Sequence, residues 1–197
     1  MIEPIKKDFA DALEMLKTFI NDELNLKAIE KAALLMVNAL RNGNKIISCG
    51  NGGSLCDAIH FAEELTGRFQ LSRRPLPAIA ISDPAHITCV ANDFGFGYVF
   101  SRYVESVGKP GDILLAISTS GNSENIKNAI LAARKNAMQV VALTGKTGGE
   151  TASMCDVEIR APYSEFSDRA QEIHTKIIHS LVHSIELELF PELYKNN

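Results

Sequence analysis

The residues best suited to acid–base or metal chemistry lie on two predicted helices that are far apart in the chain. His60 and Glu64 are four residues apart, so they share one face of a helix. Gln171 and His179 lie two turns apart on the last helix. Imidazole and carboxylate groups bind Zn²⁺ and also transfer protons. The same spacing equally allows solvated surface residues, and it does not establish that the two helices meet.

Hydroxyl groups cluster where a predicted strand, residues 112–118, leads into a predicted helix, residues 124–136. Several short donors beside the free N–H groups of a helix start suit a phosphate monoester. The chain has no lysine in the Walker position and no GxGxxG, so a nucleotide site is not indicated. An ordinary helix cap in a Ser-rich turn is the alternative. The hydroxyl residues are Ser118, Thr119, Ser120 and Ser123.

A glycine-rich turn precedes the helix that carries His60. Its residues are Gly50, Asn51, Gly52, Gly53 and Ser54. Glycines allow positive φ and a close approach of the backbone to a ligand, and the helix start that follows offers free N–H groups. In a parallel sheet, ligands bind beyond the carboxyl ends of the strands, so this turn and the hydroxyl-rich turn are expected at the same edge.

Strands that alternate with helices must position these turns. Each strand is a continuous apolar run, which is typical of a parallel sheet covered on both faces. The predicted strands span residues 46–49, 78–82, 112–118, 139–144 and 157–160. The predicted helices span residues 4–21, 26–41, 84–91, 98–107, 124–136 and 168–189, with another after Ser54 and a short one before residue 157. Asp83 is a candidate N-cap, and residues 92–95 are expected to break the helix that it begins.

Composition limits the class of protein. A chain of 197 residues with 46% hydrophobic content fits a single domain, and a net charge of −4 gives no support to nucleic-acid binding. No apolar stretch is long enough for a membrane span, so we expect a soluble cytoplasmic protein. The first helix has too much apolar surface to stand free, and we expect it to pack on the body or on another subunit.

The cysteines contain no CxxC pair. Their apolar neighbours predict small buried side chains in a reducing compartment. The four cysteines are Cys49, Cys56, Cys89 and Cys155.

Several motifs, in this order and spacing, resemble the sugar isomerase (SIS) family and, within it, the enzymes that isomerise sedoheptulose 7-phosphate. They are CGNGGS, HFAEELTGR, ANDFGF, ISTSGNS, ALTG and QEIHxxxxH. The resemblance covers nearly the whole chain. It implies an α/β, flavodoxin-like, three-layer fold with a five-stranded parallel sheet, and a single SIS domain over residues 1–197. It also implies a homotetramer in which the helices of residues 1–42 pack between subunits and active sites lie at the interfaces.

The resemblance further implies residue roles and one Zn²⁺ per subunit. Glu64 and His179 would be the catalytic pair, and the zinc ligands would be His60, Glu64, Gln171 and His179. The substrate, a phosphorylated seven-carbon sugar, would contact Asn51, Gly52, Gly53, Ser54, Asn92, Asp93, Ser118, Thr119, Ser120, Ser123, Glu64 and Gln171. Sedoheptulose 7-phosphate would become D-glycero-D-manno-heptose 7-phosphate through an enediolate, the first step towards the heptose of lipopolysaccharide core. His174 and His183 receive no role.

Other functions of the same fold remain alternatives. Some relatives are non-catalytic adaptors that bind a replication-initiation protein, and others sense sugar phosphates. Such proteins do not need an acid–base set, so the joint presence of Glu64, Gln171 and His179 favours the enzyme. An acetylated-sugar etherase or another ketose phosphate isomerase is a third option. The sequence leaves the identity of the metal and the chain length of the sugar open.

Overall fold

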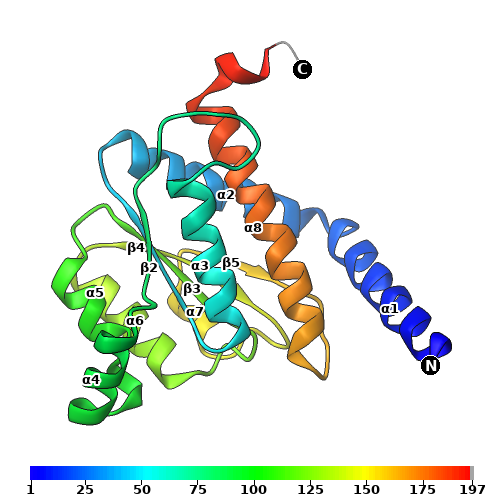
Figure 1. Cartoon of the computed structure of the whole chain (residues 1–197), viewed down its shortest axis with the longest axis horizontal. Coiled ribbons are helices and arrows are strands. Elements are labelled where there is room, and N and C mark those ends of the chain that lie inside the picture. Colours follow the sequence, from blue (N-terminus) through cyan, green and yellow to red (C-terminus); the bar gives the residue numbers. More distant parts are fainter. Residues whose placement is uncertain (196–197) are drawn as a thin grey trace.

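Five parallel strands form the central sheet of the computed structural model, which describes residues 1–195 (Figure 1). The strands are β1 (Ile46–Gly50), β2 (Ala78–Ala80), β3 (Ile113–Ser118), β4 (Gln139–Thr144) and β5 (Val157–Arg160). Their order is β2-β1-β3-β4-β5. This is the flavodoxin-like order, in which the chain changes direction between β1 and β3. The predicted fold class is therefore confirmed, and both candidate turns leave the sheet at this switch point.

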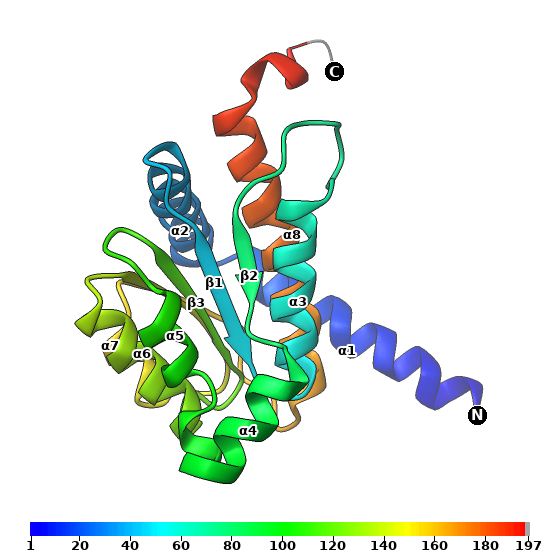
Figure 2. The same cartoon turned by 60° about the vertical axis from the view of Figure 1, so that its left-hand side comes forward.

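Helices cover both faces of the sheet (Figures 1 and 2). One face packs against α2 (Glu23–Arg41), α3 (Gly53–Thr66) and α8 (Ser167–Leu189). The other face packs against α4 (Pro84–Phe94), α5 (Ser101–Val107) and α6 (Glu124–Lys135), with the short α7 (Thr151–Met154) beside them. Two short 3-10 helices, η1 (Phe96–Tyr98) and η2 (Pro191–Tyr194), complete the described chain.

Alternation along the strands divides the core into two layers. On β3, Ile113, Leu115 and Ile117 face the α3 and α8 side, whereas Leu114 and Ala116 face the α6 side. Successive side chains of a strand point to opposite faces, so a strand that is covered on both faces needs an apolar residue at nearly every position. This explains why the central strands β1, β3 and β4 are nearly continuous apolar runs in the sequence, whereas the edge strand β5 alternates Val157 and Ile159 with Glu158 and Arg160.

The first helix, α1 (Ile2–Ile20), extends away from the body (Figures 1 and 2). Its carboxyl-terminal half contacts the core through Leu16 and the buried Phe19. The side chains of Ile5, Phe9 and Leu13, which precede Leu16 on this helix, are exposed. Within one chain, α1 therefore packs on the body only in part.

Two predictions about local structure and one about burial were wrong. The chain does not break at Asn92: α4 continues through Phe94 and ends at Gly95, whose φ of +95° suits only glycine well. The helix predicted over residues 98–107 is divided between η1 and α5. Among the cysteines, Cys49 is buried and Cys155 is half-buried, but Cys56 and Cys89 are exposed, because they lie on outward faces of α3 and α4.

Within residues 1–195, no helix is both long enough and apolar enough to cross a membrane.

Candidate active site

The glycine-rich turn after β1 fits closely against α8. A Cβ atom added at Gly53 would lie 2.5 Å from Nε2 of Gln171, so the backbone at the start of α3 touches the Gln171 side chain directly. Gly52, the N-cap of α3, has a φ of +56°. A Cβ atom at Gly50 would lie 2.3 Å from the carbonyl oxygen of Ser54. The turn therefore needs glycine for conformation at one position and for space at two others.

Polar residues continue this contact along the α3–α8 interface. One turn beyond Gly53, Asp57 Oδ1 lies 3.1 Å from Thr175 Oγ1. The other oxygen of Asp57 is buried and has no hydrogen-bond partner in residues 1–195, and burial raises the pKa of this carboxyl group. Sequence reasoning missed Asp57 and Thr175. The available signal was their position one turn before His60 and His179.

The next contact in this series is the candidate acid–base cluster. His60 Nε2 lies 2.8 Å from His179 Nε2 and 3.5 Å from Glu64 Oε1. The side chain of Glu64 is 14% exposed, whereas the neighbouring Glu63 is 62% exposed. Glu63 is thus the more solvent-exposed of the two carboxylates, with one oxygen 3.6 Å from His60 Nδ1. The structure brings together His60, Glu64 and His179 from helices that the sequence could not show to meet.

Electrostatics favour a neutral imidazole at His179. Burial, followed by the proximity of His60, lowers the pKa of His179, and the nearby Glu64 acts in the opposite direction. One nitrogen or oxygen atom from each of His60, Glu64 and His179 falls within 4.8 Å of the others. Two imidazole nitrogens and a carboxylate oxygen at this separation form a donor set that fits Zn²⁺. Gln171 contacts α3 at Gly53, two turns before His60.

The hydroxyl-rich turn after β3 is held in shape by its own hydrogen bonds. The amide of Gly121 donates to Ser118 Oγ (3.2 Å), and the hydroxyl groups of Ser118 and Ser123 lie 3.3 Å apart. Ser123 is the N-cap of α6, yet its side chain makes no capping hydrogen bond. Ser118 is buried, and the side chains of Thr119, Ser120 and Ser123 are half-buried. These hydroxyls and the first N–H groups of α6 form a cradle suited to a phosphate.

Gly121 has no substitute in this turn. Its φ is +66°, and a Cβ atom there would lie 1.9 Å from the carbonyl oxygen of Gly148. The amide of Thr151 donates to the carbonyl of Gly121 at 3.0 Å. The segment after β4 therefore packs against the hydroxyl-rich turn and donates a hydrogen bond to it.

A pair of amide side chains joins the two turns. Asn51 Nδ2 donates to Asn125 Oδ1 (2.9 Å), and Asn125 Nδ2 donates to Asn51 Oδ1 (2.8 Å). Asn125 is 3% exposed. Sequence reasoning singled out Asn51 but missed Asn125, because a polar residue in the first turn of a helix is usually solvated.

Asn92 and Asp93 lie apart from this network. Both are exposed in the last turn of α4, and Asn92 Nδ2 donates to Asp93 Oδ1 at 2.7 Å. The Cys89 thiol lies 3.7 Å from Asp93 Oδ2. Within residues 1–195, the hydrogen bonds of these two side chains do not reach the other candidate residues.

The sheet order, the glycine-rich turn and the hydroxyl-rich turn define a SIS domain protein, and residues 8–145 match the family described as the SIS domain. The chain is 57% identical over 182 residues to a phosphoheptose isomerase of Glaesserella parasuis serovar 5, covering 92% of this chain and 95% of the relative. The chain belongs to the phosphoheptose isomerases of the SIS family.

Solved structures agree with this assignment. The structure of a phosphoheptose isomerase from Francisella tularensis has a TM-score of 0.89 and 40% identity, with coverage of 93% of this chain and 97% of that chain. The phosphoheptose isomerase from Neisseria gonorrhoeae has a TM-score of 0.87 and 39% identity, with the same coverage.

Proposed function

We propose that this chain converts sedoheptulose 7-phosphate into D-glycero-D-manno-heptose 7-phosphate, the first step towards the heptose of lipopolysaccharide core. The observation that carries the proposal is the convergence of His60, Glu64 and His179 on helices α3 and α8. Relatives at 57% identity are named phosphoheptose isomerases, which favours the enzyme over a non-catalytic adaptor.

Two side chains would move the protons. Isomerisation takes a proton from C1 of the ketose and returns one to C2, with an enediolate between the two states. Glu64, a largely buried carboxylate, would transfer the carbon-bound proton. His179 would move the proton between the two oxygens, a role for which a neutral imidazole at rest is well suited.

The proposed zinc ligands are His60, Glu64, Gln171 and His179, with one ion per subunit. Zinc, when bound there, supplies a Lewis acid that polarises the sugar carbonyl. Two of these ligands are also the proposed proton-transfer residues. Glu64 must therefore be free to act as a base during turnover, since a carboxylate held by a cation is a weaker base.

The remaining candidates would bind the non-reacting part of the sugar. Binding energy from the phosphate end can be used to orient the reacting carbons. The proposed phosphate ligands are Ser118, Thr119, Ser120 and Ser123, and the proposed sugar contacts are Asn51, Gly52, Gly53, Ser54, Asn92, Asp93, Glu64 and Gln171.

The proposed activity is tested by incubating the purified protein with sedoheptulose 7-phosphate and following aldose formation. We expect turnover that a strong chelator removes and that added Zn²⁺ restores. Omitting the substrate phosphate, by using sedoheptulose, should abolish turnover at the same concentration. Failure to form any aldose in the presence of Zn²⁺ would contradict the proposal.

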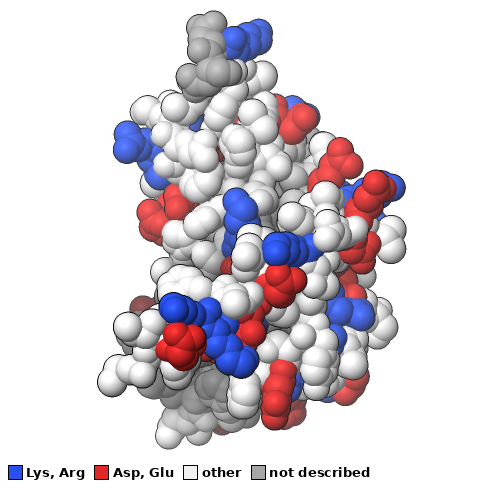
Figure 3. Space-filling view, turned by 90° about the vertical axis from the view of Figure 1, so that its right-hand side faces the viewer, with Lys and Arg blue, Asp and Glu red and all other residues white. Residues whose placement is uncertain are grey.

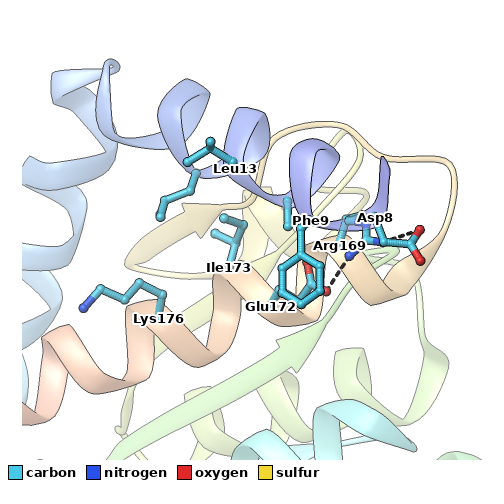
Figure 4. Close-up of a pocket in the computed structure, with 9 residues that line it drawn as sticks. Asp8, Phe9, Leu13, Arg169, Glu172, Ile173 and Lys176 are labelled. Carbon is cyan, nitrogen blue, oxygen red and sulfur yellow. Dashed lines mark hydrogen bonds and ion pairs between the residues drawn. The ribbon is translucent and has the colours of Figure 1, made fainter. Parts of the chain in front are cut away.

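We further propose that the chain is a single SIS domain that assembles as a homotetramer through the helices of residues 1–42. A groove of about 480 Å³ lies between α1 and α8, and Phe9 and Leu13 of α1 face Ile173 of α8 across it (Figure 4). Asp8 and Arg169 form an ion pair at one end of the groove. In a single chain Phe9 is 76% exposed, and burial against a second copy would remove this apolar surface from water.

Replacing both Phe9 and Leu13 by Glu is expected to convert the tetramer into smaller species. Light scattering coupled to size-exclusion chromatography measures the change. The two residues are exposed in one chain, so circular dichroism should report an unchanged fold. Lys6→Glu changes the charge of α1 by the same amount without touching its apolar face, and should leave the tetramer intact. A double variant that remains tetrameric would rule out this interface.

Surface charge and cysteine chemistry support a cytoplasmic enzyme that binds neither nucleic acid nor membranes. Lysine and arginine lie interspersed with acidic residues on the face shown in Figure 3, rather than in one basic field. The four cysteines are free, and Cys56 and Cys89 are exposed. Exposed free thiols favour a reducing compartment.

A further inference from the structure

A buried ion pair joins the α3–β2 connection to α8, the two segments next to the acid–base cluster in the chain. Arg73, in the connection between α3 and β2, donates through Nε to Oε1 of Glu186 on α8 at 2.7 Å. The two side chains are 0% and 1% exposed. Removing two charges from water is costly, and the cost is offset only where further hydrogen bonds satisfy both groups.

Arg73 uses its remaining donors on the last turn of α3. Its Nη2 donates to the carbonyl of Glu64 at 2.7 Å, and its Nη1 donates to the carbonyls of Leu65 at 2.8 Å and Gly67 at 3.2 Å. The last carbonyls of a helix have no partner within the helix, and a cation is favoured at this negative end of the dipole. The guanidinium group thus fixes the backbone of Glu64 itself.

Through its ion pair with Arg73, Glu186 links the end of α3 to α8, the helix that carries His179. The two residues are seven positions apart on α8, which corresponds to two turns. The second carboxylate oxygen of Glu186 accepts a hydrogen bond from the hydroxyl of Tyr194 at 2.6 Å. Burial and the hydrogen bond to Glu186 raise the pKa of Tyr194 to about 12, so its hydroxyl remains a donor at neutral pH.

We propose that Arg73 and Glu186 are positioning residues that set the placement of Glu64 relative to His179. The proposal rests on the roles proposed above for those two side chains. Arg73 donates a hydrogen bond to the backbone carbonyl of Glu64. Glu186, which accepts from Arg73, lies on the same helix as His179. The hydroxyl-rich turn lies at the carboxyl end of β3, whereas Arg73 lies in the connection that leads into the amino end of β2, and no hydrogen bond joins the two in the described chain. Disturbing the pair should therefore affect chemistry rather than phosphate binding.

The test uses Arg73→Lys in the full-length protein. Lysine keeps the charge but loses the planar guanidinium group that donates to the carboxylate and to four backbone carbonyls together. We expect kcat for sedoheptulose 7-phosphate to fall about 10- to 100-fold while KM changes less than threefold. Zn²⁺ affinity, measured by titration of the metal-free protein, should weaken about tenfold. Glu186→Gln keeps the shape of the side chain and should give the same pattern with a smaller loss.

A second buried ion pair provides the control. Lys45 pairs with Asp112 at the amino ends of β1 and β3, and the carboxylate also accepts hydrogen bonds from two backbone amides. Asp112→Asn should lower the thermal midpoint while leaving kcat and Zn²⁺ affinity unchanged, because in the described chain neither Lys45 nor Asp112 forms a hydrogen bond or ion pair with α3 or α8.

Folded Arg73→Lys and Glu186→Gln proteins with wild-type kcat and wild-type Zn²⁺ affinity would overturn the positioning role, as would a change confined to KM. If Arg73→Lys does not fold, Glu186→Gln decides the question. An inactive wild-type protein would contradict the proposed function alone, since the Zn²⁺ titration tests the placement of Glu64 and His179 without turnover.

Discussion

Glu64→Gln is expected to lower kcat for sedoheptulose 7-phosphate by about 1,000-fold. Glutamine has nearly the same volume, but its amide cannot accept a proton from carbon, and removal of a general base typically costs a factor of this order. The KM should change less than threefold, because the hydroxyl-rich turn at the start of α6 is untouched. Steady-state kinetics with purified protein measures both constants.

The matched control is Glu63→Gln on the same helix. Glu63 is 62% exposed, and its ion-pair partner within residues 1–195 is His60 Nδ1 at 3.6 Å, an exposed pair that contributes little energy, so this variant should keep at least half of the wild-type kcat. Metal analysis of both variants separates loss of a base from loss of a zinc ligand. A Glu64→Gln protein with more than a tenth of wild-type turnover would remove Glu64 from the proton transfer.

Acidification is expected to destabilise the protein through His174, which is completely buried on α8. Its Nε2 lies 2.8 Å from the carbonyl oxygen of Thr144, and its Nδ1 is buried without a partner in residues 1–195. Burial lowers the pKa of His174 from 6.5 to about 4. Between these values the unfolded chain binds the proton more strongly, so stability is full above pH 6.5 and falls as the pH is lowered towards 4.

The shift corresponds to a loss of about 3 kcal/mol in total, of which about 2 kcal/mol should be gone by pH 5. Urea unfolding of the wild type and of His174→Gln at pH 7 and pH 5, at one protein concentration, measures this contribution. Carboxylates common to both proteins cancel in the difference. The variant should lose about 2 kcal/mol less on acidification than the wild type. An equal loss in both proteins would show that the pKa of His174 is the same in the folded and unfolded states.

Local pattern was enough to predict most of the fold. The apolar run within residues 139–144 coincides with β4, because a strand buried on both faces requires apolar residues almost throughout. Residues 157–160 coincide with the edge strand β5, in which buried Val157 and Ile159 alternate with Glu158 and Arg160. The prediction failed at residues 92–94, where polar residues suggested a break but the exposed side of α4 accommodates them. It also failed at Cys56 and Cys89, since apolar neighbours in sequence do not determine which face of a helix a residue occupies.

The site was harder to predict than the fold because its geometry is tertiary. Spacing put His60 and Glu64 on one face, but only the packing of α3 on α8 brings His179 within 2.8 Å of His60. Arg73 lies in a connection with several polar residues, and nothing in the sequence distinguishes it from a solvent-exposed arginine. Glu186 had a detectable signal, because it occupies the buried stripe of α8 beside Val182 and Ile185, where an apolar residue is expected.

The reciprocal Asn51–Asn125 pair has a consequence for how the substrate is held. The pair fastens the start of α3 to the start of α6 across the sheet's switch point. In the proposed function these two turns bind opposite ends of the substrate, so the two hydrogen bonds set the spacing between the two binding regions. We expect a substitution at either asparagine to lower kcat/KM for the seven-carbon sugar, because that spacing would no longer be fixed.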